Sequence, residues 1–237
     1  MPQNPQSKFT GNSEGILLVD KPKSVTSFNL VAQLRRRLKV KKIGHAGTLD
    51  PFATGVMVML IGRAYTKLSD SFLASDKEYI ATVKLGETTD SYDCDGQITS
   101  TNDLIPSLEQ VRAAIAAFQG TIEQVPPMFS AKKIGGKKCY ELARQGKTVE
   151  RAACTVTVSM QLLSYTYPCM QIKVACSKGT YIRSLAHDLG AWLGCGAHLI
   201  ELRRMRSGNF SIEQCVDGSQ LLNPEYDIES KLVQLSH

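Results

Sequence analysis

Two long runs of alternating apolar and polar residues most constrain what this chain can fold into. In residues 154 to 162, Cys, Val, Val, Met and Leu alternate with Thr, Thr, Ser and Gln, and residues 170 to 176 repeat the pattern. A period of two residues is that of a β-strand with one face in the core. Because only a short connection separates the two runs, we expect the strands to pair antiparallel.

Further patterns predict the elements around this pair. Residues 16 to 19 form an apolar run typical of a buried strand, and residues 79 to 85 and 198 to 210 also look like strands. Apolar residues at helical spacing predict three helices, and their expected capping residues are Thr26 or Ser27, Ser107 with Gln110, and Thr180. The layout is mixed α/β (α+β), in which helices flank a central, mostly antiparallel sheet.

The chain shows no sign of a division into domains. Residues 1 to 13 are polar and without periodicity, so we expect a flexible N-terminal tail. Residues 14 to 237 contain no internal repeat and no change of composition that would mark a linker. The whole chain has 43% hydrophobic residues, and we expect residues 14 to 237 to fold as one domain with a sizeable core.

Several classes of protein are disfavoured by the composition. The longest apolar stretch, residues 56 to 61, is far shorter than the roughly 20 residues of a membrane-spanning helix, and no charged and apolar leader opens the chain. The seven cysteines are scattered and form no Cys-x-x-Cys pair, which argues against a disulfide scaffold or a zinc site. We therefore expect a cytoplasmic protein without membrane contact.

Basic residues occur in two clusters. The formal net charge is +6; six cations lie between residues 35 and 42, and four lysines lie between residues 132 and 138. Such clusters fit a polyanionic partner, although charge runs are more commonly just solvated faces. The glycine- and lysine-rich stretch from residue 130 to 138 interrupts patterned sequence, which favours a mobile loop that holds RNA through its phosphates.

The segment from residue 44 to 55, Gly-His-Ala-Gly-Thr-Leu-Asp-Pro-Phe-Ala-Thr-Gly, is the most unusual part of the sequence. Its three glycines allow sharp turns and a close approach of the backbone to a ligand. Pro51 disfavours helical geometry at Asp50, so we expect this carboxylate on a loop directly before the apolar strand that begins at residue 56. Asp-Pro is also a routine turn initiator.

This segment closely resembles the signature of the TruB family of tRNA pseudouridine synthases. Other segments agree with the family in order and spacing: residues 15 to 22, 76 to 79, 85 to 90, 126 to 132, 140 to 146, 177 to 183, 196 to 199 and 202 to 204. The resemblance implies the pseudouridine synthase fold with a thumb-like RNA-binding loop. It also implies isomerisation of the uridine at tRNA position 55, in the TΨC stem-loop, without cofactor or metal.

Site residues follow from the same resemblance. It makes Asp50 the essential carboxylate, places Tyr79 against the target base and pairs Arg183 with the aspartate. It also assigns substrate or RNA contacts to His45, Tyr181, Leu202, Lys21 and Lys132. From the residues alone, Tyr79 fits a core aromatic, Tyr181 fits packing at a helix start and His45 fits a loop histidine. Arg183 lies in a first helical turn, where a cation opposes the helix dipole and requires an anionic partner.

The resemblance also concerns partners and chain length. The expected partner is the TΨC stem-loop of tRNA, no protein partner is implied, and we expect a monomer. Bacterial relatives continue into a small C-terminal RNA-binding module of the PUA type, whereas about 27 residues follow Phe210 here. That module is therefore expected to be absent or vestigial.

The chemistry of the reaction agrees with these assignments. With an ordinary pKa of roughly 3.9, an aspartate is ionised at neutral pH and can act as nucleophile or base. A base in a folded loop must be flipped out to reach so short a side chain. Whether the carboxylate attacks the ring, attacks C1′ or removes the C2′ proton stays open. The sequence is also compatible with a synthase for another RNA, with a non-catalytic RNA-binding or RNA-folding module, and with a basic protein that has no RNA role.

Overall fold

The structure, a computed structural model, describes residues 13 to 235 and divides into two compact units. Unit 1 takes in Met1–Ser75 and Arg204–His237, and unit 2 is Asp76–Arg203. The predicted tail lies outside the described residues except for Ser13, and the expectation of one domain over residues 14 to 237 stays a prediction. Among residues 13 to 235, no helix has the length and apolarity needed to cross a membrane.

Unit 1 is built on strands β1 and β3, which pair antiparallel from Gly15↔Ile61 to Lys21↔Gly55. Strand β2 pairs with the other edge of β3, and β14 pairs parallel with β1. The elements of this unit are β1 (Gly15–Lys21), α1 (Ser27–Leu38), β2 (Ile43–Ala46), β3 (Thr54–Ile61), α2 (Arg63–Thr66), α3 (Ser69–Leu73), β13 (Phe210–Ser211), η1 (Ile212–Gln214), β14 (Val216–Asp217), η2 (Gly218–Leu222) and η3 (Glu229–Lys231).

Strand β1 is buried on both faces over residues 16 to 19, which explains the apolar run there. Ile16 and Leu18 form a core cluster with residues of β2 and β3. Leu17 and Val19 point to the opposite face and are also buried. Helix α1 begins as predicted, since the side chain of Thr26 accepts a hydrogen bond from the Asn29 amide. Its apolar residues Leu30, Val31, Leu34 and Leu38 are buried.

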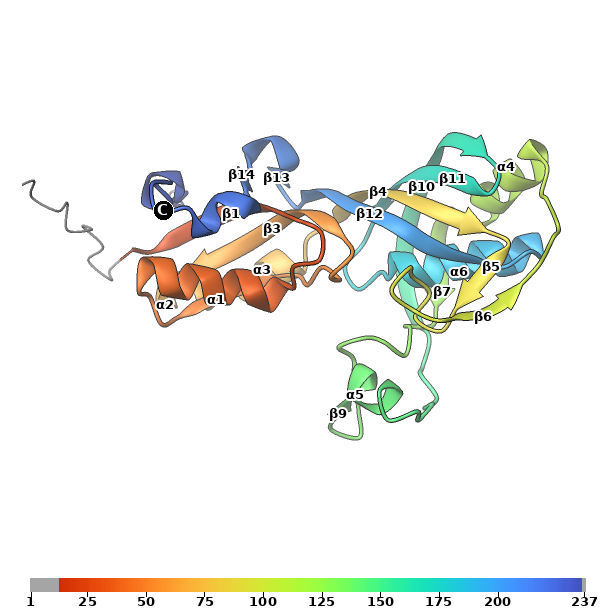
Figure 1. Cartoon of the computed structure of the whole chain (residues 1–237), viewed down its shortest axis with the longest axis horizontal. Coiled ribbons are helices and arrows are strands. Elements are labelled where there is room, and N and C mark those ends of the chain that lie inside the picture. The colour runs from red at the N-terminus through yellow and green to blue at the C-terminus, as the bar shows by residue number, and fades with distance from the viewer. Residues whose placement is uncertain (1–12, 236–237) are drawn as a thin grey trace, which may run out of the picture. The chain divides into compact units, whose positions relative to one another are not determined.

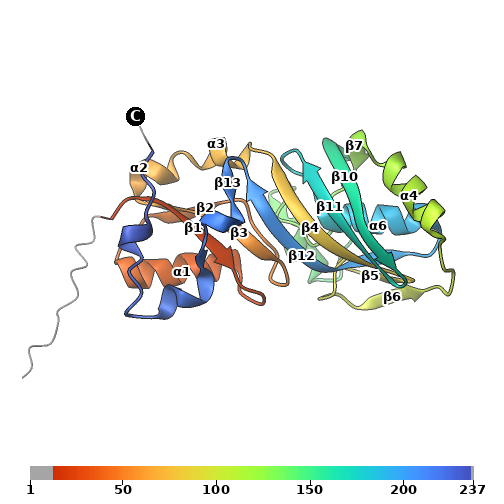
Figure 2. The same cartoon turned by 90° about the horizontal axis from the view of Figure 1, so that it is seen from above.

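Unit 2 contains the predicted antiparallel pair at the centre of a sheet of order β12-β4-β11-β10-β7 (Figures 1 and 2). β10 and β11 pair from Val158↔Cys176 to Thr166↔Cys169, and β11 pairs antiparallel with β4. The elements are β4 (Lys77–Leu85), β5 (Glu87–Thr89), β6 (Ile98–Thr101), α4 (Leu108–Ala117), β7 (Gly120–Gln124), β8 (Lys133–Ile134), β9 (Lys137–Lys138), α5 (Cys139–Ala143), β10 (Cys154–Thr166), β11 (Cys169–Cys176), α6 (Ile182–Leu193) and β12 (Ala197–Ser207), which ends in unit 1.

Helices α4 and α6 contact each other and the sheet of unit 2. The predicted capping box at Ser107 and Gln110 is present. The predicted Thr180 cap is wrong: Tyr181 occupies the N-cap position, and the Thr180 hydroxyl donates to the Ser177 carbonyl 2.9 Å away. That hydroxyl therefore closes the preceding turn. Helix α6 is terminated by Gly194, whose left-handed backbone geometry is common after the last turn of a helix.

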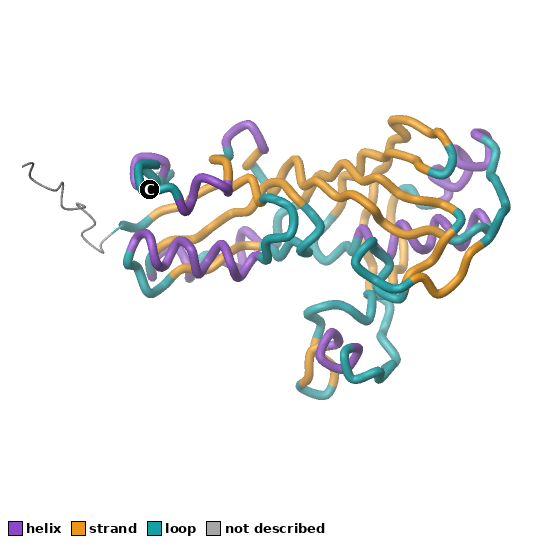
Figure 3. Tube along the Cα trace, viewed as in Figure 1, coloured by secondary structure: helices purple, strands orange, loops and turns teal. Residues whose placement is uncertain are grey.

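Residues 126 to 153 of unit 2, here called the protruding segment, extend away from the sheet. The segment consists of loop, the short β8–β9 hairpin and helix α5 (Figure 3). It is the part of the chain in which the sequence predicted an RNA-holding loop. The mixed, mostly antiparallel sheet with flanking helices confirms the predicted fold class.

Candidate active site

Asp50 lies in the loop between β2 and β3, as predicted. This loop, residues 47 to 53, turns sharply at its ends: Gly47 has a φ of 94° and Gly55, just inside β3, a φ of 105°. A Cβ atom on Gly55 would lie 2.2 Å from the carbonyl oxygen of Arg204. Two of the three motif glycines are therefore required by backbone geometry.

Ser27, the first residue of α1, holds the loop next to Asp50. Its hydroxyl accepts a hydrogen bond from the Leu49 amide at 3.0 Å and donates to the Leu49 carbonyl at 3.1 Å. On the other side of the aspartate, the Ser24 amide donates to the Pro51 carbonyl at 2.8 Å. The carboxylate-bearing residue is thus fixed by its two chain neighbours.

Lys21 lies fully buried beneath the same loop. Its ammonium donates to the carbonyl oxygens of Pro22, Val25 and Pro51 at 3.0, 2.6 and 3.1 Å. Burial lowers the pKa of Lys21 from 10.5 to about 8; the charge of Asp50 opposes this shift and that of Arg204 adds to it. Lys21 therefore supports the Asp50 loop, and the RNA contact assigned to it by resemblance stays a prediction.

The buried Lys21 should make stability depend on pH. Because the folded protein releases this proton near pH 8 and the unfolded chain near 10.5, the unfolded state binds more protons between these values. Stability should therefore rise with pH across this window, by up to about 3 kcal/mol. Urea unfolding at both ends of the window checks this.

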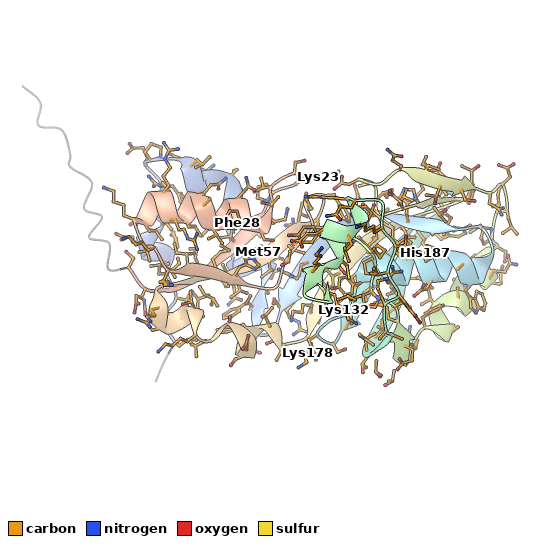
Figure 4. The ribbon with its side chains drawn as sticks, turned by 90° about the horizontal axis from the view of Figure 1, so that it is seen from below. Lys23, Phe28, Met57, Lys132, Lys178 and His187 are labelled. Carbon is orange, nitrogen blue, oxygen red and sulfur yellow. The ribbon has the colours of Figure 1, made fainter. Side chains whose placement is uncertain are left out.

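Matched lysine variants isolate the contribution of Lys21. Lys21→Met should remove the rise, whereas Lys23→Met, at an exposed lysine labelled in Figure 4, should keep it. An identical pH dependence in wild type and Lys21→Met would contradict the expectation.

His45 lies on strand β2, opposite Met59 of β3, rather than in the loop. Burial lowers the pKa of His45, and the charge of Arg204 lowers it further. The imidazole is therefore neutral at pH 7, and its Nδ1 atom is buried without a hydrogen-bond partner. A neutral ring of this kind is suited to stacking on a nucleobase.

Arg183, in the first turn of α6 in unit 2, has the anionic partner that its position required. Its guanidinium lies 3.2 Å from a carboxylate oxygen of Asp93, and both side chains are about 95% buried. It also donates to the carbonyl oxygens of Ser91 and Phe129 at 3.1 and 2.8 Å. The pairing of Arg183 with Asp50, inferred from resemblance, stays a prediction.

Sequence reasoning missed Asp93, which follows strand β5. Its other carboxylate oxygen accepts hydrogen bonds from the Ser91 hydroxyl and the Asp95 amide at 2.5 and 3.1 Å. Between Ser91 and Asp93, Tyr92 stacks on His187 of α6, with ring centroids 3.9 Å apart; His187 is labelled in Figure 4. The one indication in the sequence that Arg183 has such a partner was its position at the start of α6, where a cation requires an anion nearby.

Three other predicted site residues belong to unit 2. Two lie on its sheet, and one lies at the start of α6. Tyr79 is buried in the core register of β4, and Leu202 is buried on β12. The Gln124 side chain accepts from the Tyr181 amide at 2.7 Å and donates to the Tyr181 carbonyl at 3.0 Å. These contacts fix the start of α6, and the substrate contacts of the three residues stay predictions.

Lys132 lies at the start of the protruding segment (Figure 4). Its ammonium donates to the Ala152 carbonyl at 3.2 Å and to the Cys154 sulfur at 3.0 Å. Lys132 therefore joins the beginning of the segment to its end, and its RNA contact stays a prediction.

The basic cluster of residues 35 to 42 has two parts. Arg35 donates to the Ile43 carbonyl at 3.1 Å, and Arg37 donates to the Tyr226 carbonyl at 3.0 Å. Four other cations are exposed: Arg36, Lys39, Lys41 and Lys42. Lys41 and Lys42 line a surface hollow together with Arg63. These exposed cations form a basic surface on unit 1.

Metal-binding groups do not gather in the part of the chain that the structure describes. There, no three side chains among His, Cys, Asp and Glu lie close enough to hold a metal ion. The expectation that the reaction needs neither metal nor cofactor stays a prediction.

Known proteins resemble this chain over most of its length. Residues 35 to 182 match the model of the TruB family pseudouridylate synthase N-terminal domain, and residues 183 to 235 match that of the tRNA pseudouridylate synthase B C-terminal domain. The tRNA pseudouridine synthase B of Protochlamydia amoebophila is 64% identical over 208 residues, 88% of this chain and 79% of that protein. The protein of the same name from Chlamydia felis is 61% identical over 92% of this chain and 93% of its own length.

A solved structure agrees with the sequence comparisons. A chain in the crystal structure of a Cbf5-Nop10-Gar1 complex superposes with a TM-score of 0.70 at 28% identity, over 94% of this chain. This chain spans 60% of that larger one. The match of the family model over residues 35 to 182, which include the Asp50 loop, and the high identity to full-length relatives together establish that this chain belongs to the TruB family of pseudouridylate synthases.

Proposed function

We propose that this chain isomerises uridine to pseudouridine at position 55 in the TΨC loop of tRNA, with Asp50 as the catalytic carboxylate. The observation that carries the proposal is the family match across the segment that bears Asp50. The local geometry supports it, because Ser27 of α1 and Lys21 hold the Asp50 loop by donating hydrogen bonds to the Leu49 and Pro51 carbonyls.

The reaction exchanges one bond between base and sugar for another. The bond from uracil N1 to ribose C1′ breaks, the base turns, and C5 joins C1′. C5 loses its proton and N1 gains one, so substrate and product have the same composition. A carboxylate that is ionised at neutral pH can act as nucleophile or base in such a sequence.

The target nucleotide must leave its stack before Asp50 can reach it. Flipping costs a few kcal/mol, and stacking of the base on an aromatic ring can return about 1 to 3 kcal/mol. We assign this contact to Tyr79 and assign His45, which is neutral at pH 7, to the RNA near the flipped nucleotide. Arg183 would act through its positive charge on the anionic groups of the reaction.

Mass-spectrometric mapping of modified uridines tests the proposal. After incubation with unmodified tRNA, pseudouridine should form at position 55 and in an isolated TΨC stem-loop. Pseudouridine formation only in another RNA would show that the substrate is that RNA and not tRNA. RNA binding without pseudouridine formation would support a non-catalytic RNA-binding protein.

The basic surface on unit 1 should contribute to RNA affinity through phosphate contacts. In that case the logarithm of the binding constant falls linearly with the logarithm of salt concentration, and each lost contact reduces this slope by roughly 0.7 to 0.9. The double variant Lys41→Gln with Lys42→Gln should lower the slope by up to about twice that amount. Lys231→Gln, at an exposed lysine of η3, serves as control. Equal slopes in all proteins would exclude these two lysines from the RNA contact.

A further inference from the structure

Arg204, near the end of β12, is a charged side chain in an unusual environment. It is 1% exposed and is among the largest fully buried side chains of the described residues. A guanidinium stays protonated at any physiological pH. Because taking such an ion out of water costs several kcal/mol, its burial requires compensating contacts.

These contacts are made with both ends of the Asp50 loop. On the side before Asp50, Arg204 donates to the carbonyl oxygens of Gly47 at 3.2 Å and Thr48 at 3.5 Å. On the side after it, Nε donates to the Val56 carbonyl at 2.7 Å, and Nη2 lies 3.1 Å from the sulfur of Met57. The guanidinium thus links the start of the loop to the first residues of β3, which follow the loop.

The glycines of the motif fit this arrangement. A Cβ atom on Gly47 would lie 3.4 Å from a guanidinium nitrogen of Arg204, and one on Gly55 would collide with the Arg204 backbone. Both glycines also have positive φ angles. Gly44, the third motif glycine, would place a Cβ at an ordinary 3.6 Å from Thr66. The two glycines that the backbone requires are therefore the two beside Arg204.

The charge of Arg204 also reaches the groups around the loop. None of its acceptors bears a full negative charge, and its field lowers the pKa values of both His45 and Lys21. The positive potential of Arg204 and Lys21 favours an anion at the centre of the loop, where Asp50 lies.

We propose that Arg204 is a positioning residue that joins the two ends of the Asp50 loop and so presents the carboxylate in one orientation. The catalytic consequence rests on the proposed function, in which Asp50 is the reacting group. The ordering of the loop by Arg204 is a property of the protein without RNA.

Two substitutions of Arg204 test the proposal against one control. Arg204→Met keeps the length of the side chain without its donors, and Arg204→Lys keeps the charge but cannot reach both ends of the loop at once. The control is Arg206→Lys, two residues along the same strand; Arg206 donates to the Gly208 carbonyl at 2.7 Å.

Hydrogen exchange of residues 44 to 57 and single-turnover pseudouridine formation are measured, with RNA affinity and thermal unfolding alongside. In both Arg204 variants we expect at least about tenfold faster exchange in this segment, with other segments unchanged. The single-turnover rate should fall about 100-fold, a loss typical of misplaced catalytic groups, while RNA affinity stays within about threefold of wild type. The control should match wild type.

Hydrogen exchange tests the role of Arg204 in the loop, and pseudouridine formation by the wild-type protein tests the proposed function. Unchanged exchange in residues 44 to 57 of either folded Arg204 variant would overturn the positioning role, as would an equal increase in Arg206→Lys. If Arg204→Met does not fold, Arg204→Lys decides by the same criteria. A wild-type protein that forms no pseudouridine would refute the proposed function, while the exchange result would still settle the role of Arg204 in the loop.

Discussion

Replacing Asp50 by Asn is expected to abolish pseudouridine formation, with a fall in the single-turnover rate of at least about 10⁴-fold. The amide has nearly the same shape as the carboxylate, but it is neither a nucleophile nor a base at neutral pH. RNA affinity should stay within about threefold of wild type, because phosphate contacts dominate it. Quantifying pseudouridine by mass spectrometry and measuring RNA binding by filter retention check both expectations.

A matched control separates chemistry from a general change of charge. Asp70→Asn removes one negative charge at an exposed position of α3 in the same unit, and we expect wild-type turnover. Turnover retained in Asp50→Asn would refute the catalytic assignment. A parallel loss of RNA binding would show instead that Asp50 serves mainly to hold the loop.

The second large effect concerns stability. Asp93→Asn should lower the free energy of unfolding by about 3 to 5 kcal/mol, because it removes a negative charge that lies 3.2 Å from the buried guanidinium of Arg183. The asparagine oxygen can still accept from Ser91 and Asp95, but its NH2 group would face the guanidinium, donor against donor. Urea unfolding at neutral pH measures the loss.

An exposed ion pair on the same unit provides the comparison. Lys173 and Glu78 lie 3.3 Å apart with partly exposed side chains, so Lys173→Gln should cost less than about 1 kcal/mol. A comparable small loss in Asp93→Asn would mean that water or another group compensates Arg183. Such a result would contradict a large contribution of Asp93 to the stability of the buried guanidinium.

Much of the fold could be predicted because its signals are local. The alternation of residues 154 to 176 specified two strands and their antiparallel pairing. The Thr26 cap and the Ser107 capping box involve atoms three residues apart. Thr180 shows the limit of such reasoning, since its hydroxyl had a second local partner in Ser177 and used it.

The sequence predicted the candidate residues of the site better than the residues that hold them in place. The motif and its family resemblance pointed to Asp50, and the helix dipole indicated that Arg183 needed an anion. Neither identified Asp93, whose partner lies 90 positions further along the chain. The resemblance assigned Lys21 to RNA, which stays a prediction, but did not indicate that Lys21 also supports the Asp50 loop through the Pro51 carbonyl.

The sequence by itself determined the main strand and helix patterns, the family and the candidate carboxylate, because each depends on residues that are neighbours along the chain or stand in one motif. Only the tertiary structure decided what holds the loop that bears Asp50: Ser27, Lys21 and Arg204, the last bonded to carbonyls 148 and 157 positions away. The physical reason is that burial of a cation and the choice of its acceptors follow from how strands distant in sequence pack together, and side-chain periodicity carries no record of that packing.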